Sequence, residues 1–85
     1  MTTKADCAQR IAAYLANEIS HDELIKWADA AVLEEAFPEK DGRLLLGVLS
    51  DLSASRAPGF LQRVEDYQAL LRELGFRMET KLVAA

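Results

Sequence analysis

The chain has 85 residues, of which 51% are hydrophobic and 28% are charged, and its formal net charge is −4. This length fits one domain over residues 1–85, and this composition is typical of a folded domain rather than a disordered one. With one cysteine and one histidine, the chain can form neither an intramolecular disulfide nor a zinc site built from cysteine and histidine, and we expect no metal and no cofactor.

No apolar run approaches the roughly 18–20 residues that a bilayer-spanning helix needs. The N-terminal region also lacks the pattern of a signal peptide. A secreted domain of this size usually depends on disulfides, which a single cysteine cannot form. The sequence therefore predicts a soluble, cytoplasmic protein with no membrane partner.

Helical periodicity recurs along the chain, whereas sustained alternation of apolar and polar residues, the pattern of strands, is missing. The first predicted helix spans residues 3–16. Thr3 can cap its N-terminus, and Asp6 lies in the first turn, where the helix dipole favours a negative charge. Cys7 is expected to be a buried packing thiol. The predicted apolar face comprises Cys7, Ala8, Ile11, Tyr14 and Leu15.

The second predicted helix has the clearest start in the chain. Ser20 and Glu23 have the spacing of a capping box, in which each side chain accepts a hydrogen bond from the backbone N–H of the other residue. His21, at the first position of the helix, is expected to be exposed to solvent. Pro38 lacks a backbone N–H and ends the helix near Phe37. The predicted inward face comprises Leu24, Ile25, Ala28, Ala31 and Val32.

The third predicted helix runs from an N-cap at Asp41 to about Ala54. Its apolar residues cover more than half of its circumference, which is typical of the most buried helix of a small bundle. Gly47 lies in the middle of this helix, where glycine costs about 1 kcal/mol of helix propensity relative to alanine. A close crossing with another helix at Gly47 would account for that cost.

The fourth predicted helix follows a turn and runs from Pro58 or Gly59 to Leu74. Gly75 is expected to end it in a left-handed conformation, and residues 77–85 form a tail that is docked or frayed. The sequence thus predicts an all-α fold, a compact bundle of four helices with a short C-terminal tail. The apolar residues of the fourth helix form a narrow seam, which comprises Phe60, Val64, Tyr67, Leu71 and Leu74.

The acidic residues are unevenly distributed along the chain. Residues 18–41 contain eight acidic residues and two lysines, a net charge of −6, whereas the rest of the chain has a net charge of +2. Long-range electrostatics oppose the association of such a protein with DNA, RNA or anionic lipid. The same charge favours a basic protein as the partner.

The second predicted helix carries most of the candidate binding residues. Asp22 and Asp29 lie two helical turns apart and point outward from one face, and the adjoining flank carries Trp27. Trp27 is either a partly buried residue at the edge of the core or an anchor that fills a pocket of a partner. A solvated face is the other interpretation of the acidic residues. The residues predicted to bind a partner are Asp22, Glu23, Trp27, Asp29 and Glu34.

The sequence predicts neither an enzyme nor a nucleic-acid-binding module. Adjacent acidic residues such as Glu34 and Glu35 point about 100° apart on a helix, so they do not form a catalytic dyad. The glycines match neither a phosphate-binding loop nor a dinucleotide fingerprint. Arg63 and Arg72 lie on opposite sides of the fourth predicted helix, so they do not form one basic stripe for phosphates.

The stretch from Tyr14 to Ala28, YLANEISHDELIKWA, resembles the opening of small helical bacterial proteins that include immunity proteins of the colicin D type. The shared pattern is Y-L-x-x-E-I-S-x-x-E-L. The resemblance implies an acidic helical protein that masks the basic active site of a toxin. It assigns no individual binding residue.

The predicted function is non-catalytic protein binding through the acidic surface of residues 18–41. One such function is that of an immunity or inhibitor protein that masks a basic toxin surface. Complementary charge would speed the encounter with such a partner. The alternative is a small structural or regulatory homodimer that buries part of the third or fourth helix, because a single core of this size is marginally stable on its own.

Overall fold

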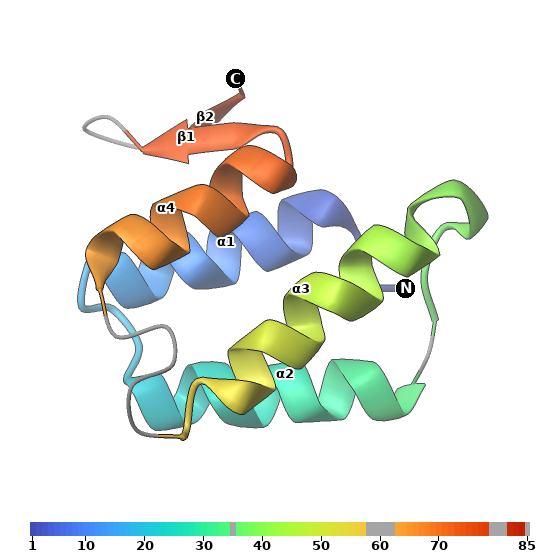
Figure 1. The fold of residues 1–85 in the computed structure, drawn as a ribbon, viewed down its shortest axis with the longest axis horizontal. Helices are drawn as coiled ribbons and strands as arrows, with labels where there is room; N and C mark the ends of the chain where they lie inside the picture. Colours follow the sequence, from blue (N-terminus) through green and yellow to red (C-terminus); the bar gives the residue numbers. More distant parts are fainter. Residues whose placement is uncertain (35, 58–62, 79–81, 85) are drawn as a thin grey trace.

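Two pairs of helices enclose the core of the protein. The computed structural model describes residues 1–34, 36–57, 63–78 and 82–84. In Figure 1, α1 lies beside α4, α2 packs across α3, and a pair of short strands covers α1 and α4 on the side away from α2. The four predicted helices are confirmed, and the described part of the fold is mostly helical. The elements are α1 (Lys4–Leu15), α2 (His21–Glu34), the 3-10 turn η1 (Glu39–Asp41), α3 (Gly42–Ala54), α4 (Val64–Glu73), β1 (Phe76–Met78) and β2 (Leu82–Ala84).

The starts of α1 and α2 follow local signals in the sequence. At α2, the Ser20 hydroxyl accepts a hydrogen bond from the Glu23 N–H at 3.1 Å, and the Glu23 carboxylate accepts one from the Ser20 N–H at 3.3 Å. Thr3 and Asp6 form the same pair of bonds at the start of α1. Each pair satisfies backbone groups that a helix start leaves without intrahelical partners. The predicted capping box at Ser20 is therefore confirmed.

α1 and α4 both end at a residue with a left-handed backbone. Gly75 has a φ of 90°, and its N–H donates to the Arg72 carbonyl at 3.0 Å, which confirms the predicted C-terminal glycine. Asn17 has a φ of 61° after α1, and the N–H of Glu18 donates to the Ala13 carbonyl at 2.8 Å. Asparagine tolerates this conformation better than most residues, because its short side chain bonds locally.

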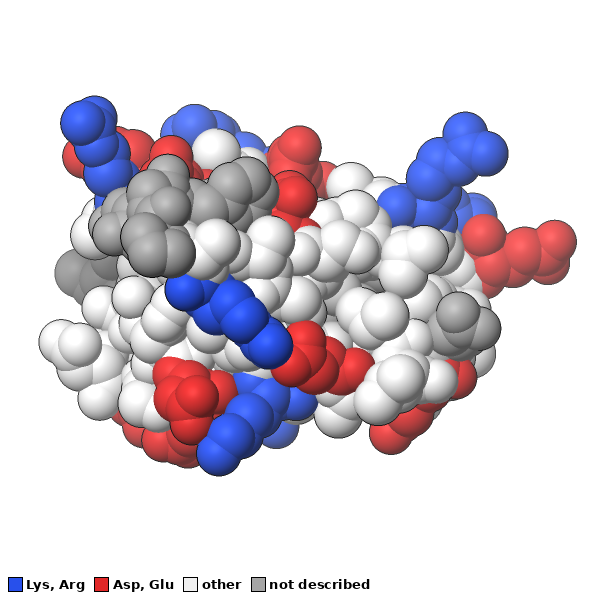
Figure 2. Space-filling model, turned by 60° about the horizontal axis from the view of Figure 1, so that its bottom comes forward, with Lys and Arg blue, Asp and Glu red and all other residues white. Residues whose placement is uncertain are grey.

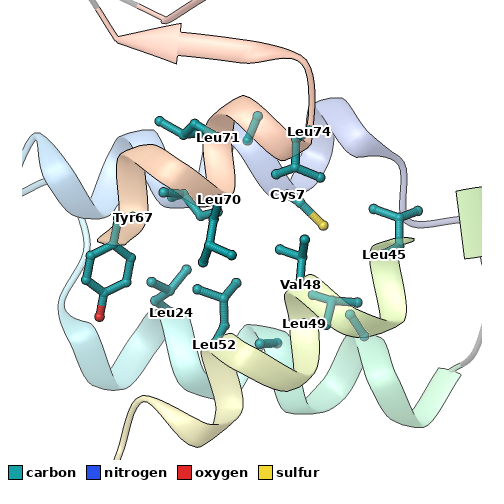
Figure 3. Packing of buried hydrophobic residues seen from close by; sticks show 14 residues of the cluster. Cys7, Leu24, Leu45, Val48, Leu49, Leu52, Tyr67, Leu70, Leu71 and Leu74 are labelled. Atoms are coloured by element: carbon teal, nitrogen blue, oxygen red, sulfur yellow. The ribbon is translucent and has the colours of Figure 1, made fainter. Parts of the chain in front are cut away.

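The core forms where the four helices meet, and leucine supplies most of its volume (Figure 3). Cys7 belongs to this core, with its sulfur directed toward Val48, so the predicted packing thiol is confirmed. α3 turns one side to the core, whereas Leu46 on its other side is 41% exposed. The buried residues of the core are Cys7, Ala8, Ile11, Leu24, Ala28, Ala31, Leu45, Val48, Leu49, Leu52, Tyr67, Leu70, Leu71 and Leu74.

The prediction of a purely all-α fold is wrong at the C-terminus, where β1 and β2 form an antiparallel pair in place of a simple tail. Phe76 lies opposite Ala84 and Met78 lies opposite Leu82. Phe76, Met78 and Leu82 pack against the core, whereas Arg77 is exposed. An alternation of three residues is too short to identify a strand from sequence, and a two-stranded hairpin depends on such packing for its stability.

α4 begins later than predicted. Its N-cap is Arg63 and its first residue is Val64. The predicted start at Pro58 or Gly59 lies outside the described residues, as does Phe60, the first residue of the predicted seam. The Asp66 carboxylate accepts a hydrogen bond from the Arg63 N–H at 3.2 Å, so an acidic residue in the first turn fixes this start. Val64 is 56% exposed, so its predicted place in the buried seam is wrong.

Gly47 lies on the exposed side of α3, and the predicted close crossing there is wrong. Apart from Gly47, its two chain neighbours and the nearby backbone of α3, no described atom lies within 4 Å of the position that a β-carbon of residue 47 would take. Glycine in this position therefore lowers the stability of the helix without a packing contact that offsets the cost.

Gly47→Ala is expected to raise the free energy of unfolding by about 0.5–1 kcal/mol, because alanine has the higher helix propensity and meets no neighbour. Urea unfolding followed by circular dichroism measures the change. Gly75→Ala is the control, since alanine at a φ of 90° is strained and should destabilise the protein. A lower midpoint for Gly47→Ala would contradict the open environment described for this residue.

Candidate partner-binding site

All five predicted binding residues lie on α2, but the structure brings only Trp27 and Glu34 into one pocket. Asp22 and Glu23 are exposed in the first turn of the helix, and Asp29 is half-buried beside the end of α3. The five residues therefore differ in what they contact.

Asp29 is bound by one side chain from the last turn of α3 and one from the turn that follows it. The Ser53 hydroxyl donates to Asp29 Oδ1 at 2.6 Å, and the Arg56 guanidinium donates to Oδ2. The hydrogen bond from Ser53, followed by that from Arg56, holds the pKa of the Asp29 carboxyl below its ordinary value. Asp29 thus stabilises the α2–α3 contact, and much of its charge is compensated within the chain.

Asp22 also has a partner within the chain. Lys26 Nζ lies 3.1 Å from Asp22 Oδ2, one turn further along α2, and both side chains are about three-quarters exposed. An exposed pair at this spacing contributes only about 0.3–0.5 kcal/mol, so a partner protein can separate it at little cost. On the face shown in Figure 2, acidic and basic side chains lie next to each other between uncharged areas. The acidic side chains seen on this face therefore do not form one uniformly negative surface.

Trp27 and Glu34 line a pocket between α1 and α2, which we call the Trp27 pocket. Its volume is about 290 Å³. Trp27 is partly buried and packs against the core, which fixes the position of its ring. The N–H of Thr2 donates to the Ala36 carbonyl at 2.8 Å and holds the N-terminal residues against the end of α2. The pocket is lined by Met1, Thr2, Asp6, Gln9, Arg10, Trp27 and Glu34.

The Trp27 pocket contains both signs of charge. The guanidinium carbon of Arg10 lies 5.4 Å from the centroid of the Trp27 ring, which is a cation–π contact. Asp6 and Glu34 are exposed, and among the described residues neither forms an ion pair within 4 Å. Arg10 and Asp6 come from a different helix from Trp27, so no local pattern in the sequence could have assigned them to the site.

A second side-chain cluster lies where α2 begins. His21 Nε2 is 2.9 Å from Ser55 Oγ, and the ring centroid of Tyr14 lies 5.5 Å from that of His21 and 5.0 Å from that of Tyr67. The prediction of an exposed His21 is therefore wrong. The Ser55 hydroxyl donates to the Leu52 carbonyl, and its contact with His21 links the start of α2 to the C-cap of α3. Burial raises the pKa of the Tyr67 hydroxyl above its ordinary value.

No family model, curated protein or solved structure shows significant similarity to the chain. Within the described residues, no helix combines the length and the apolar character needed to cross a membrane. The same part of the chain contains no group of three or more histidine, cysteine, aspartate or glutamate side chains placed to hold a metal ion.

Proposed function

We propose that the chain is a non-catalytic module that binds a basic protein through α2, with Trp27 as the anchor. The observation that carries the proposal is the Trp27 pocket, in which a ring of fixed position lies beside the exposed carboxylates of Asp6 and Glu34. Tryptophan is enriched among the residues that dominate protein interfaces, and neighbouring charges steer a partner of opposite sign. Asp22 and Glu23 would add to this steering.

The resemblance of residues 14–28 to immunity proteins of the colicin D type supports a toxin as the basic partner. A toxin that cleaves nucleic acid carries basic groups where the phosphates bind. An inhibitor that presents carboxylates to these groups competes with the substrate and gains a fast encounter from complementary charge. In this form of the proposal, the chain protects the cell by covering the active site of the toxin.

The test compares wild type with the double variant Asp22→Lys/Glu34→Lys. Asp29 is left unchanged, because a lysine there would face Arg56 and weaken the α2–α3 contact. Each protein is immobilised and used to capture proteins from a lysate of the source cells, and the captured proteins are identified and purified. We expect a basic protein that wild type retains and that the double variant binds at least about tenfold more weakly.

The rate constants of the purified partner separate steering from anchoring. The double variant should slow association, and the difference should shrink as salt rises, since exposed charges are screened over about 8–10 Å. Trp27→Ala should mainly speed dissociation. Glu65→Lys/Glu73→Lys, which changes the charge by the same amount on the exposed side of α4, is the control. An unchanged association rate for Asp22→Lys/Glu34→Lys would contradict the proposal.

A small helical homodimer is the second candidate, and exposed leucines on α2 and on α3 favour it. Leu33 is 85% exposed and Leu46 is 41% exposed. A second copy of the chain that covered these side chains would remove apolar surface from water. Sedimentation velocity over a range of concentrations tests this candidate, with Leu33→Glu as the variant that should abolish a dimer. A monomer at all concentrations would rule it out.

A further inference from the structure

In the free protein, a cation of the chain itself occupies the face of Trp27. The guanidinium carbon of Arg10 lies 5.4 Å from the centroid of the Trp27 ring. Asp6 and Glu34 line the same pocket of about 290 Å³. The pocket therefore combines an aromatic ring that carries a guanidinium group with two carboxylates that have no ion-pair partner within 4 Å among the described residues, and this combination suits an arginine side chain.

We propose that the Trp27 pocket binds one arginine side chain of the partner protein, and that Arg10 occupies the place of this side chain until the partner binds. This inference rests on the proposed function. Arginine fits better than lysine, because a planar guanidinium stacks on the ring and has five N–H donors for the carboxylates of Asp6 and Glu34. Arg10 is itself part of the pocket wall, so the volume of about 290 Å³ is the space beside its side chain, and displacement of Arg10 would add to it.

The exchange of one arginine for another keeps the charges in the pocket balanced. Arg10 is an exposed residue of α1, and a cation–π contact at an exposed site is weak. Once displaced, its guanidinium regains water, while the incoming guanidinium takes over the ring and also pairs with the carboxylates of Asp6 and Glu34, with which Arg10 forms no ion pair within 4 Å. A neutral or acidic side chain would displace Arg10 without replacing its cation–π contact. Arg10 therefore makes the pocket selective for a cation as well as weakening the binding of every ligand.

A short peptide tests the pocket without the natural partner. The probe is a capped tri-arginine peptide at low salt, and the readout is the indole N–H signal of Trp27, the single tryptophan of the chain, in the NMR spectrum of ¹⁵N-labelled protein. Arg10→Met, which keeps the length of the side chain without its charge, should bind the peptide about 2–5-fold more tightly than wild type. Arg72→Met removes one positive charge from an exposed position on α4 and should leave the affinity nearly unchanged.

Two neutral substitutions test the role of the carboxylates. Glu34→Gln should weaken binding about 2–5-fold, whereas Glu65→Gln, an equal change of charge on α4, should not. A tri-citrulline peptide, which has nearly the same shape without the charge, should not move the Trp27 signal. The inference is overturned if tri-arginine does not move this signal, if tri-citrulline moves it equally, or if Arg10→Met and Arg72→Met tighten binding equally.

The two proposals fail in different experiments. In one outcome, wild type captures a basic protein that Asp22→Lys/Glu34→Lys does not, but the Trp27 signal does not respond to tri-arginine. This outcome would overturn the arginine pocket and support the proposed basic partner. In the other outcome, tri-arginine binds in the pocket, but wild type and the double variant capture the same proteins equally well. This outcome would overturn the proposed function and support the arginine pocket.

Discussion

Replacing Leu49 by alanine is expected to lower the free energy of unfolding by about 2–5 kcal/mol. Leu49 lies in the middle of α3 with 0% of its surface exposed, among the other core side chains in Figure 3. Alanine removes most of the side chain and leaves a cavity, because close-packed neighbours relax only partly into the space. A chain of 85 residues typically has a free energy of unfolding of about 4–13 kcal/mol, so this change removes a large share of it.

Leu33→Ala is the matched control, because it makes the same chemical change on a helix at a position that is 85% exposed. Its effect should stay within about 0.5 kcal/mol, since alanine and leucine differ little in helix propensity and no buried volume is lost. Urea unfolding followed by circular dichroism compares the two variants with wild type. Similar losses for Leu49→Ala and Leu33→Ala would contradict the assignment of the inner and outer sides of these helices.

The parts of the fold that could be predicted from the sequence are those fixed by residues close together in the chain. Ser20 and Glu23 are three positions apart, and their reciprocal bonds place the start of α2 whatever the rest of the chain does. Gly75 ends α4 for an equally local reason, because glycine adopts a positive φ without strain. The inner sides of the helices also followed from periodicity, with Leu24 as one example.

The errors lie where distant residues decide the structure. β1 and β2 are three residues each, and packing of Phe76 and Leu82 on the helices stabilises them more than any local preference does. The close crossing predicted at Gly47 depends on how the helices are arranged, which the residues around Gly47 in the sequence do not determine. Val64 fits the apolar period of α4 but lies in its first turn, where it is exposed.

The candidate site was predictable only as one flank of a helix. The period of α2 places Trp27 and Glu34 on the same flank, and both line the Trp27 pocket. Arg10 precedes Trp27 by 17 positions and reaches it from another helix. Asp29 finds its partners Ser53 and Arg56 at separations of 24 and 27 positions. Contacts between residues so far apart in the sequence depend on how the helices pack, and the apolar period of one segment does not predict that packing.

Alkylation of Cys7 by iodoacetamide at pH 8 is expected to be at least about a thousandfold slower in the native protein than in the unfolded chain. Burial, followed by the charge of Asp6, raises the pKa of the Cys7 thiol from 9.0 to about 12. The thiolate is the reactive form, and at pH 8 this rise lowers its fraction by about a thousandfold. Since 0% of Cys7 is exposed, the reagent is also excluded sterically. Mass spectrometry follows the reaction at this single cysteine.

The stability variants show whether this protection comes from the packed core. If alkylation requires Cys7 to leave the core, its rate depends on the free energy of opening. Leu49→Ala, which weakens the same core, should therefore speed the reaction, whereas Leu33→Ala should leave the rate of wild type unchanged. Alkylation of native Cys7 at the rate of the unfolded chain would show that α1 does not bury this thiol against α3 and α4. A slow rate that Leu49→Ala does not change would instead show that α1 opens independently of the core around Leu49.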